Sequence, residues 1–200
     1  MTHATVRIIR QEHAALSAMF RAIVLSLERH RKKGSLPDFA ALRAMLFYVD
    51  EFPEQRHHRK ETEILFPKLR ARTPISRDLL DRLDCDHARG ERRIRDVEHA
   101  LLAFEMLGES RREAFEKKVS DYVDFYLNHM ALEEREILPL AERVLSANDW
   151  LDLDEAFAQN RDSMTGHVPD FEYNALFALF ALFARIVSMA PAPIGARRAP

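Results

Sequence analysis

Apolar residues recur at intervals of three and four along most of the first 147 residues, the pattern of amphipathic helices packed in a bundle. Three runs are regular: Val6, Ile9, Leu16, Phe20, Ile23 and Leu27; Leu80, Leu83, Ile94, Val97, Leu101 and Phe104; Phe115, Val119, Tyr122, Tyr126, Ile137, Leu140 and Val144. A less regular run, Leu42, Leu46, Val49 and Ile64, is interrupted at Pro53. The pattern therefore predicts four long helices.

Residues that end or begin helices divide these runs. We expect ends at Gly34–Pro37, Thr73-Pro74, Gly108 and Asn148-Asp149, and a capping box at Ser110 and Glu113 that opens the fourth helix. The helix that Asn148-Asp149 opens should be short and extend to about Gln159. Pro53 and Pro139 lie inside predicted helices, where we expect kinks.

Short connections between four helices favour an all-α, antiparallel bundle with up-down-up-down order. The bundle would occupy residues 1–147. Residues 148–200 would form a C-terminal helical extension that finishes in a disordered, proline-rich tail over residues 191–200.

Polar residues interrupt the apolar face of every predicted helix. They are His13 in the first helix, His57 and Glu61 in the second, His87 in the third, and His129 and Glu133 in the fourth. All six lie roughly 8–16 residues from the same end of an antiparallel bundle, and at about 1.5 Å per residue this allows one common level. A buried carboxylate is costly without a partner, so these side chains need one another or a cation.

The spacing His-x-x-x-Glu occurs twice, at His57–Glu61 and at His129–Glu133. Residues four apart stack on one helix face, so both side chains of a pair can reach the same ion. Imidazole with carboxylate suits iron, manganese or zinc, and two carboxylates that can each bridge suit a centre of two metals. Cysteine is absent from the set, which argues against a structural zinc site.

These motifs resemble the hemerythrin-like family, also called the HHE cation-binding domain. The matching residues are His13, the segment His57–Pro67, Asp86-His87, and His129–Glu134 followed by Pro139. The resemblance implies two iron ions bridged by an oxo or hydroxo group and by Glu61 and Glu133. It further implies that His13 and His57 serve one iron and that His87 and His129 serve the other.

One position departs from the oxygen-carrying hemerythrins, which have a second histidine one turn after the one in the third helix. Glu91 stands there in this chain. The resemblance therefore implies fewer nitrogen ligands and more open coordination, which favours redox reactivity, nitric-oxide binding or iron handling over reversible oxygen carriage.

Several neighbouring residues keep two interpretations. His58 is interpreted as a supporting or solvated residue with metal binding as the alternative, and Glu91 as half of a flanking ion pair with the same alternative. Tyr126 is interpreted as core packing, with a hydrogen bond near the metals as the alternative. Gly90 either permits close packing or leaves room for a small ligand such as O2, and Cys85 should be an inert, buried thiol.

Composition narrows the setting. Charged residues make up 31% of the 200 residues and the net charge is −2, so no basic excess suggests nucleic acid. A single cysteine and a charged N-terminal segment favour a cytoplasmic protein. The segment from Ala175 to Ala184 is apolar on every face but too short to span a membrane, so we expect it to form a homodimer through residues 170–188, or to cover the bundle.

Three functions remain open from the sequence. The favoured one is a non-haem di-iron protein that binds or reacts with O2 or NO, or handles iron, and is not a classifiable enzyme. The second is a di-iron oxidase or peroxidase that acts on a small molecule. The third is a metal-free helical interaction module. A ferritin-like oxidase is disfavoured because it needs two Glu-x-x-His motifs, and Tyr126 occupies the glutamate position before His129.

Overall fold

The computed structural model describes residues 3–159, and every regular element in that part of the chain is a helix. The α-helices are α1 (Ala4–Lys33), α2 (Phe39–Val49), α3 (His58–Lys60), α4 (Phe66–Arg72), α5 (Arg77–Leu107), α6 (Arg112–Leu132), α7 (Leu138–Val144) and α8 (Ala147–Ala158). Three π-helices, η1 (Asp50–His57), η2 (Glu61–Leu65) and η4 (Glu133–Ile137), and a 3-10 turn, η3 (Glu109–Arg111), join them.

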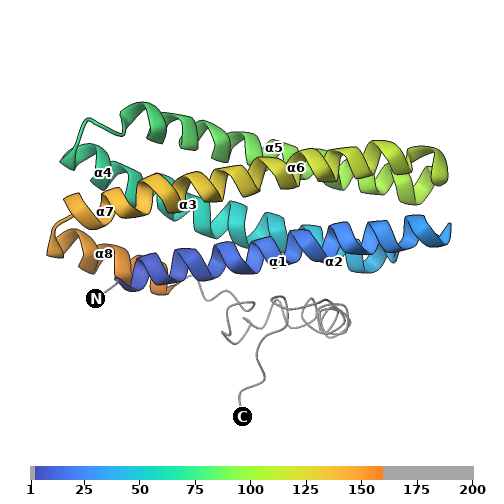
Figure 1. The fold of residues 1–200 in the computed structure, drawn as a ribbon, viewed down its shortest axis with the longest axis horizontal. Coiled ribbons are helices and arrows are strands. Elements are labelled where there is room, and N and C mark those ends of the chain that lie inside the picture. Colours follow the sequence, from blue (N-terminus) through green and yellow to red (C-terminus); the bar gives the residue numbers. More distant parts are fainter. Residues whose placement is uncertain (1–2, 160–200) are drawn as a thin grey trace, which may run out of the picture.

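These elements pack lengthwise as a helical bundle (Figure 1). Helix α5 packs against α6, α1 against α6 and α8, and α2 against α5. The predicted all-helical fold is confirmed. The segment 170–188, for which the sequence predicts a dimer interface, lies outside the described residues, as does the tail.

Two glycines end long helices as predicted. Gly34 follows α1 with φ 62°, and Gly108 follows α5 with φ 77°. A side chain is strained in this left-handed region, so glycine is the residue that can turn the chain there. The backbone N–H groups of Gly34 and Ser35 donate to the carbonyls of Arg31 and His30, which satisfies two acceptors that the helix leaves open.

The predicted capping box at Ser110 and Glu113 is wrong. Helix α6 begins at Arg112, and no side chain caps it. The segment instead folds into the turn η3, because the buried Arg112 binds Glu109 and donates to the backbone oxygen of Ser35 at 2.8 Å. The residue that caps α8 is also different from the expected Asn148-Asp149: Ser146 is the N-cap, and Asp149 completes a capping box with it.

Each π-helix is associated with a proline. Pro53 lies inside η1, while Pro67 and Pro139 each follow a π-helix by two residues. Proline has no N–H to donate and its ring crowds the carbonyl four residues earlier, so the α-helical bonding pattern is interrupted there. The chain responds with wider turns: Phe66 N–H donates to the Glu61 carbonyl, and Leu138 N–H donates to the Glu133 carbonyl.

The hydrophobic core consists of two separate clusters. One combines residues Leu16–Leu27 of α1 with α2, the later half of α5, and α6. The other combines Val6 and Ile9 of α1 with α4, the start of α5, α7 and α8. Along each long helix, the predicted histidines and glutamates fall between the two clusters. They form a polar layer across the bundle.

Candidate metal centre

The six predicted ligands all lie buried within this polar layer. His13, His57 and His87 are 4%, 4% and 7% exposed, and Glu61, His129 and Glu133 are 2% exposed or less. They come from four separate stretches of the chain: α1, η1 with η2, α5, and α6 with η4. The structure therefore brings together every residue that the sequence predicts as a ligand.

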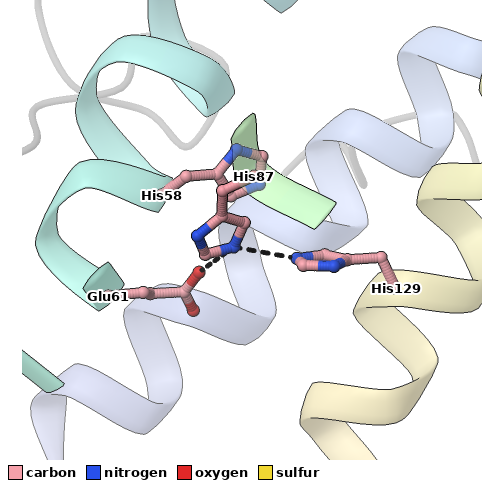
Figure 2. Close-up of side chains that lie close together, drawn as sticks. All are labelled: His58, Glu61, His87 and His129. Carbon is pink, nitrogen blue, oxygen red and sulfur yellow. Dashed lines mark hydrogen bonds and ion pairs between the residues drawn. The ribbon is translucent and has the colours of Figure 1, made fainter. Parts of the chain in front are cut away.

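The histidine nitrogens meet in two pairs. His13 Nε2 lies 3.3 Å from His57 Nε2, and His87 Nε2 lies 3.0 Å from His129 Nε2. Figure 2 shows His87 and His129 pointing toward one another beside Glu61. Two ligand atoms that are each about 2.1 Å from one metal and near a right angle apart are about 3 Å from each other. Both separations are close to that value.

The carboxylate of Glu61 spans the two pairs. Its Oε1 lies 3.4 Å from His57 Nε2, and its Oε2 lies 3.5 Å from His87 Nε2.

Glu133 spans the same two pairs from the other side of the layer. Its Oε2 lies 3.4 Å from His13 Nε2, and its Oε1 lies 3.2 Å from His129 Nε2. Each carboxylate thus offers one oxygen to each histidine pair, which is the arrangement that two bridged metal positions require.

The chemistry of the donor set fits cations. Glu61 Oε2 and both carboxylate oxygens of Glu133 are buried and accept no hydrogen bond within the described chain. A buried carboxylate oxygen without a donor costs free energy, and a metal ion would remove that cost. Two groups of four ligand atoms each lie within 4.8 Å of one another: His13, His57, Glu61 and Glu133, and His58, Glu61, His87 and His129.

His58 is the residue in this set that the sequence interpretation placed outside the ligands. Its side chain is 3% exposed, and its ring stacks on His87 at 4.3 Å and on Tyr126 at 5.3 Å between centroids. His57 ends η1 and His58 begins α3, and both side chains are buried. The sequence signal that could have identified His58 is the pair of adjacent histidines, His57-His58, shortly before Glu61.

Glu91 does not approach the layer. It is about half exposed and pairs with Arg95 at 3.8 Å, as the flanking ion-pair interpretation predicts. The histidine that lies beside His87 and His129 instead is His58, from a different helix.

The outer nitrogens of three of the four predicted histidine ligands also have close partners. His57 Nδ1 lies 2.6 Å from Glu12, His13 Nδ1 lies 3.0 Å from Glu134, and His87 Nδ1 lies 2.8 Å from the Thr62 hydroxyl. His129 Nδ1 has only Asp86, at 3.9 Å. Such contacts fix the tautomer and ring orientation of a histidine whose other nitrogen faces a metal.

Charge in the layer shifts the pKa values in opposite directions. Burial by itself lowers the pKa of His129, but Glu133 and Asp86 outweigh it and raise that pKa to about 10. Burial would raise the pKa of Glu133, yet His129, His13 and His87 hold it well below its usual range. Burial and the neighbouring histidines His87 and His57 lower the pKa of His58 well below 6.5, so His58 presents a neutral ring. Without a cation, a protonated His129 balances the charge of the Glu133 carboxylate.

A small cavity adjoins the His13 and His57 side of the layer. It is lined on its apolar side by Leu16, Tyr48, Phe52 and Pro53, and its free volume is about 10 Å³. That is room for about one water-sized molecule.

Cys85 is exposed, so the expectation of a buried thiol is wrong. It stands on α5 one position before Asp86 and faces away from the core.

In the described part of the chain, no helix is both long and apolar enough to cross a membrane.

Comparison with known proteins agrees with the geometry. No curated protein and no solved structure matches the chain. The profile of the hemerythrin HHE cation binding domain matches residues 4–141, which contain every residue of the polar layer. This match covers more than half of the chain, which therefore belongs to the hemerythrin HHE cation-binding family.

Proposed function

We propose that the protein binds two iron ions in the polar layer and uses them to bind or react with O2 or NO, or to handle iron. The observation that carries the proposal is the pair of buried carboxylates, Glu61 and Glu133, each with one oxygen beside each histidine pair. A single metal ion would need only one histidine pair with its adjacent carboxylate oxygens, so the presence of two such sets favours two ions.

The residues divide between two metal positions. His13 and His57 would hold one iron, while His58, His87 and His129 would hold the other. Glu61 would contact both, and so would Glu133, whose Oε1 lies 3.2 Å from His129 Nε2. Iron bound there supplies a centre that can change oxidation state and coordinate a small molecule. The protein's own part is to exclude water and to hold the ligand rings in place through Glu12, Glu134 and Thr62.

The small cavity beside His13 and His57 supports a diatomic ligand. Its volume admits a molecule of about the size of water, and an apolar wall suits uncharged O2 or NO. An oxidase that acts on an organic substrate at His13 and His57 would need a larger site there, and the cavity described beside these two residues is too small to be one. We therefore favour binding or sensing of a small gas over turnover of an organic molecule.

The same proposal includes three features of the whole protein. The lengthwise contacts of α1, α2, α5 and α6 support the antiparallel up-down-up-down order. A lone cysteine supports a cytoplasmic location. The apolar composition of residues 170–188 supports a homodimer, and sedimentation of the full chain beside a version that ends at residue 169 would test it.

Metal analysis after anaerobic purification tests the iron centre directly. We expect about two irons per chain and, after exposure to air, near-ultraviolet absorption that is absent from the metal-free protein. Full loading with zinc or manganese from an iron-replete culture would contradict the choice of iron but not the site.

A second experiment tests the ligands. The double variant Glu61→Gln, Glu133→Gln should lose both irons, and a chelator should no longer lower its Tm, because binding energy at the centre contributes to folding. The matched control is Glu63→Gln, Glu136→Gln, which changes two exposed carboxylates of the same π-helices that pair with Arg59 and Arg135. Equal chelator responses in the wild type and the Glu61 and Glu133 variant would contradict the proposal.

A further inference from the structure

An open hollow lies on the outer side of His129, between α5 and the α6–η4 segment. Its volume is about 620 Å³, and it is lined by Arg82, Asp86, Arg89, Arg93, Phe125, Asn128, His129 and Arg135, together with Ala131 and Leu132. This range of volume is that of sites for small organic ligands. The hollow is distinct from the small cavity at His13 and His57.

The hollow carries an excess of positive charge. Four guanidinium groups line it against one carboxylate, that of Asp86. Asp86 is shared between Arg82 at 3.8 Å and Arg89 at 3.7 Å, so neither arginine has a close carboxylate of its own there. Arg135 contacts Glu136 at 3.0 Å, outside the lining.

Arg93 completes the charge pattern. Its guanidinium lies over the Phe125 ring at 4.4 Å, and no carboxylate pairs with it within the described residues. Some cations elsewhere on the surface have close carboxylates of their own, as in Arg70 with Asp81 and Asp84 at 2.7 Å and Lys117 with Asp121 at 2.8 Å. Asp96, Asp121 and Asp124 line a neighbouring hollow that Arg93 borders, so the excess is confined to this side of Arg93.

The floor of the hollow touches the metal centre. His129 is 2% exposed, and its Nδ1 has no hydrogen-bond partner in the described chain. The nearest acceptor is Asp86 Oδ2 at 3.9 Å. Arg82 contacts this same oxygen at 3.8 Å, and Arg89 contacts Asp86 Oδ1 at 3.7 Å. Among the four predicted histidine ligands, His129 is the one whose outer nitrogen lacks a close partner.

We propose that the arginine hollow of Arg82, Arg89, Arg93 and Arg135 binds a phosphate group, carried by inorganic phosphate or a small phosphate ester, and that its occupancy is coupled to the metal centre through Asp86 and His129. Several guanidinium groups around one ligand match a dianion with oxygens on every side, because each can donate two hydrogen bonds.

The coupling has a definite direction. A bound phosphate competes with Asp86 for the ion pairs of Arg82 and Arg89, which releases Asp86 to approach His129 Nδ1. A charged acceptor at that nitrogen makes the ring a stronger donor to its metal, and the phosphate adds negative charge nearby. Both effects favour the more highly charged metal. Phosphate therefore lowers the reduction potential of iron at this position, and by linkage the oxidised protein binds phosphate more tightly.

Phosphate binding is measured first on the full chain loaded with zinc, so that this arm does not depend on the proposed iron function. Calorimetry with inorganic phosphate and with a nucleoside monophosphate distinguishes the two sources. Arg89→Gln, Arg93→Gln should weaken binding about tenfold or more, because it removes two charged hydrogen-bond donors. The matched control, Arg92→Gln, Arg95→Gln, changes two exposed arginines of the same helix outside the hollow and should bind as the wild type does.

Coupling is measured on the iron-loaded chain, and this arm rests on the proposed function. Saturating phosphate should lower the reduction potential, and Asp86→Asn should reduce that shift while phosphate still binds. Equal affinity in wild type and the Arg89 and Arg93 variant, or equal loss in the control, would overturn the site. An unchanged potential with phosphate bound would overturn the coupling. Failure to load iron, with phosphate binding intact, would instead count against the proposed function.

Discussion

The contacts of the outer histidine nitrogens differ between the two histidine pairs. His13 and His57 face the carboxylates of Glu134 and Glu12 at 3.0 and 2.6 Å, whereas His87 faces the neutral hydroxyl of Thr62. A carboxylate at the outer nitrogen increases the donor strength of an imidazole more than a hydroxyl does. The His13 and His57 position should therefore hold the more highly charged ion.

Glu12→Gln tests the contribution of these contacts. The variant replaces a charged acceptor at His57 with a neutral amide of the same shape, and we expect metal affinity to fall by about 10–100-fold. Competition with a chromophoric chelator measures it. Glu28→Gln, an exposed change on the same helix, is the control and should leave the affinity unchanged. An affinity for Glu12→Gln within twofold of the wild type would mean that the contact has no such role.

The sequence identified six residues of the layer because each interrupts an apolar helical pattern, and because His57–Glu61 and His129–Glu133 repeat one spacing. His58 escaped this reasoning because an α-helix directs adjacent residues about 100° apart. In the structure both rings are buried nonetheless, His57 at the end of η1 and His58 at the start of α3. Cys85 was misplaced for a simpler reason, since a lone cysteine carries no periodic signal.

At the scale of the elements, the two glutamates that span the metal positions occupy equivalent places. Glu61 and Glu133 each begin a π-helix, each accept the i+5 backbone bond, and each precede a proline by six residues, Pro67 and Pro139. π-helical turns are rare and occur often at functional sites. The prolines keep these turns from tightening to an α-helix, and so keep both carboxylates at the level of the histidines.

Pro67→Ala, Pro139→Ala should separate stability from metal binding. Alanine restores the missing N–H, so the turns can tighten and rotate Glu61 and Glu133 away from their positions. We expect the metal-free protein to melt at the same temperature or higher, with metal affinity reduced about tenfold or more. Pro74→Ala, an exposed change in the connection before α5, controls for the loss of a proline. Wild-type affinity in the double variant would contradict this role of the prolines.

The cap of α8 predicts a dependence of stability on pH. The Asp149 carboxylate accepts from the Ser146 hydroxyl and backbone and from Arg72, which lowers its pKa to about 2. A depressed folded-state pKa gives stability that is present above the unfolded value, near 3.9, and is lost as the pH falls toward 2.

Asp149→Asn should therefore lower the Tm at pH 7, since loss of a cap costs about 1 kcal/mol, and the difference from the wild type should shrink between about pH 4 and pH 2. Thermal melts across this range measure it. Asp152→Asn, which alters an exposed carboxylate beside Lys68, should show a smaller effect. A Tm difference that persists unchanged at pH 2 would rule out this linkage.

At the scale of the whole molecule, the sequence predicted the helical class and most helix ends, because apolar periodicity and glycine at helix ends depend on local residues. It did not reveal that α8 belongs to the core. Trp150, Leu153 and Phe157 are buried with Val6 and Ile9 of α1, and residues this far apart in the chain leave no local sign of their contact. The match to residues 4–141 ends before this helix.

Because the polar layer separates the two hydrophobic clusters, the metal-free protein should not behave as one cooperative unit. Protonated histidines and paired carboxylates hold the layer less firmly than metal ions, so each half can open with its own free energy. Hydrogen exchange followed residue by residue should show one opening energy for the loaded protein and two, divided near His13, His87 and His129, after chelation. A single shared value after chelation would contradict this division.

Loss of a bound metal would then do more than empty a site. The bundle would become less rigid at the polar layer. The half that contains α8 and the start of α1 could then unfold locally while the other half stays folded. Proteases, or a partner that binds only the rigid form, would then distinguish the metal-loaded from the metal-free protein. No change in the chemistry of the protein surface would be needed.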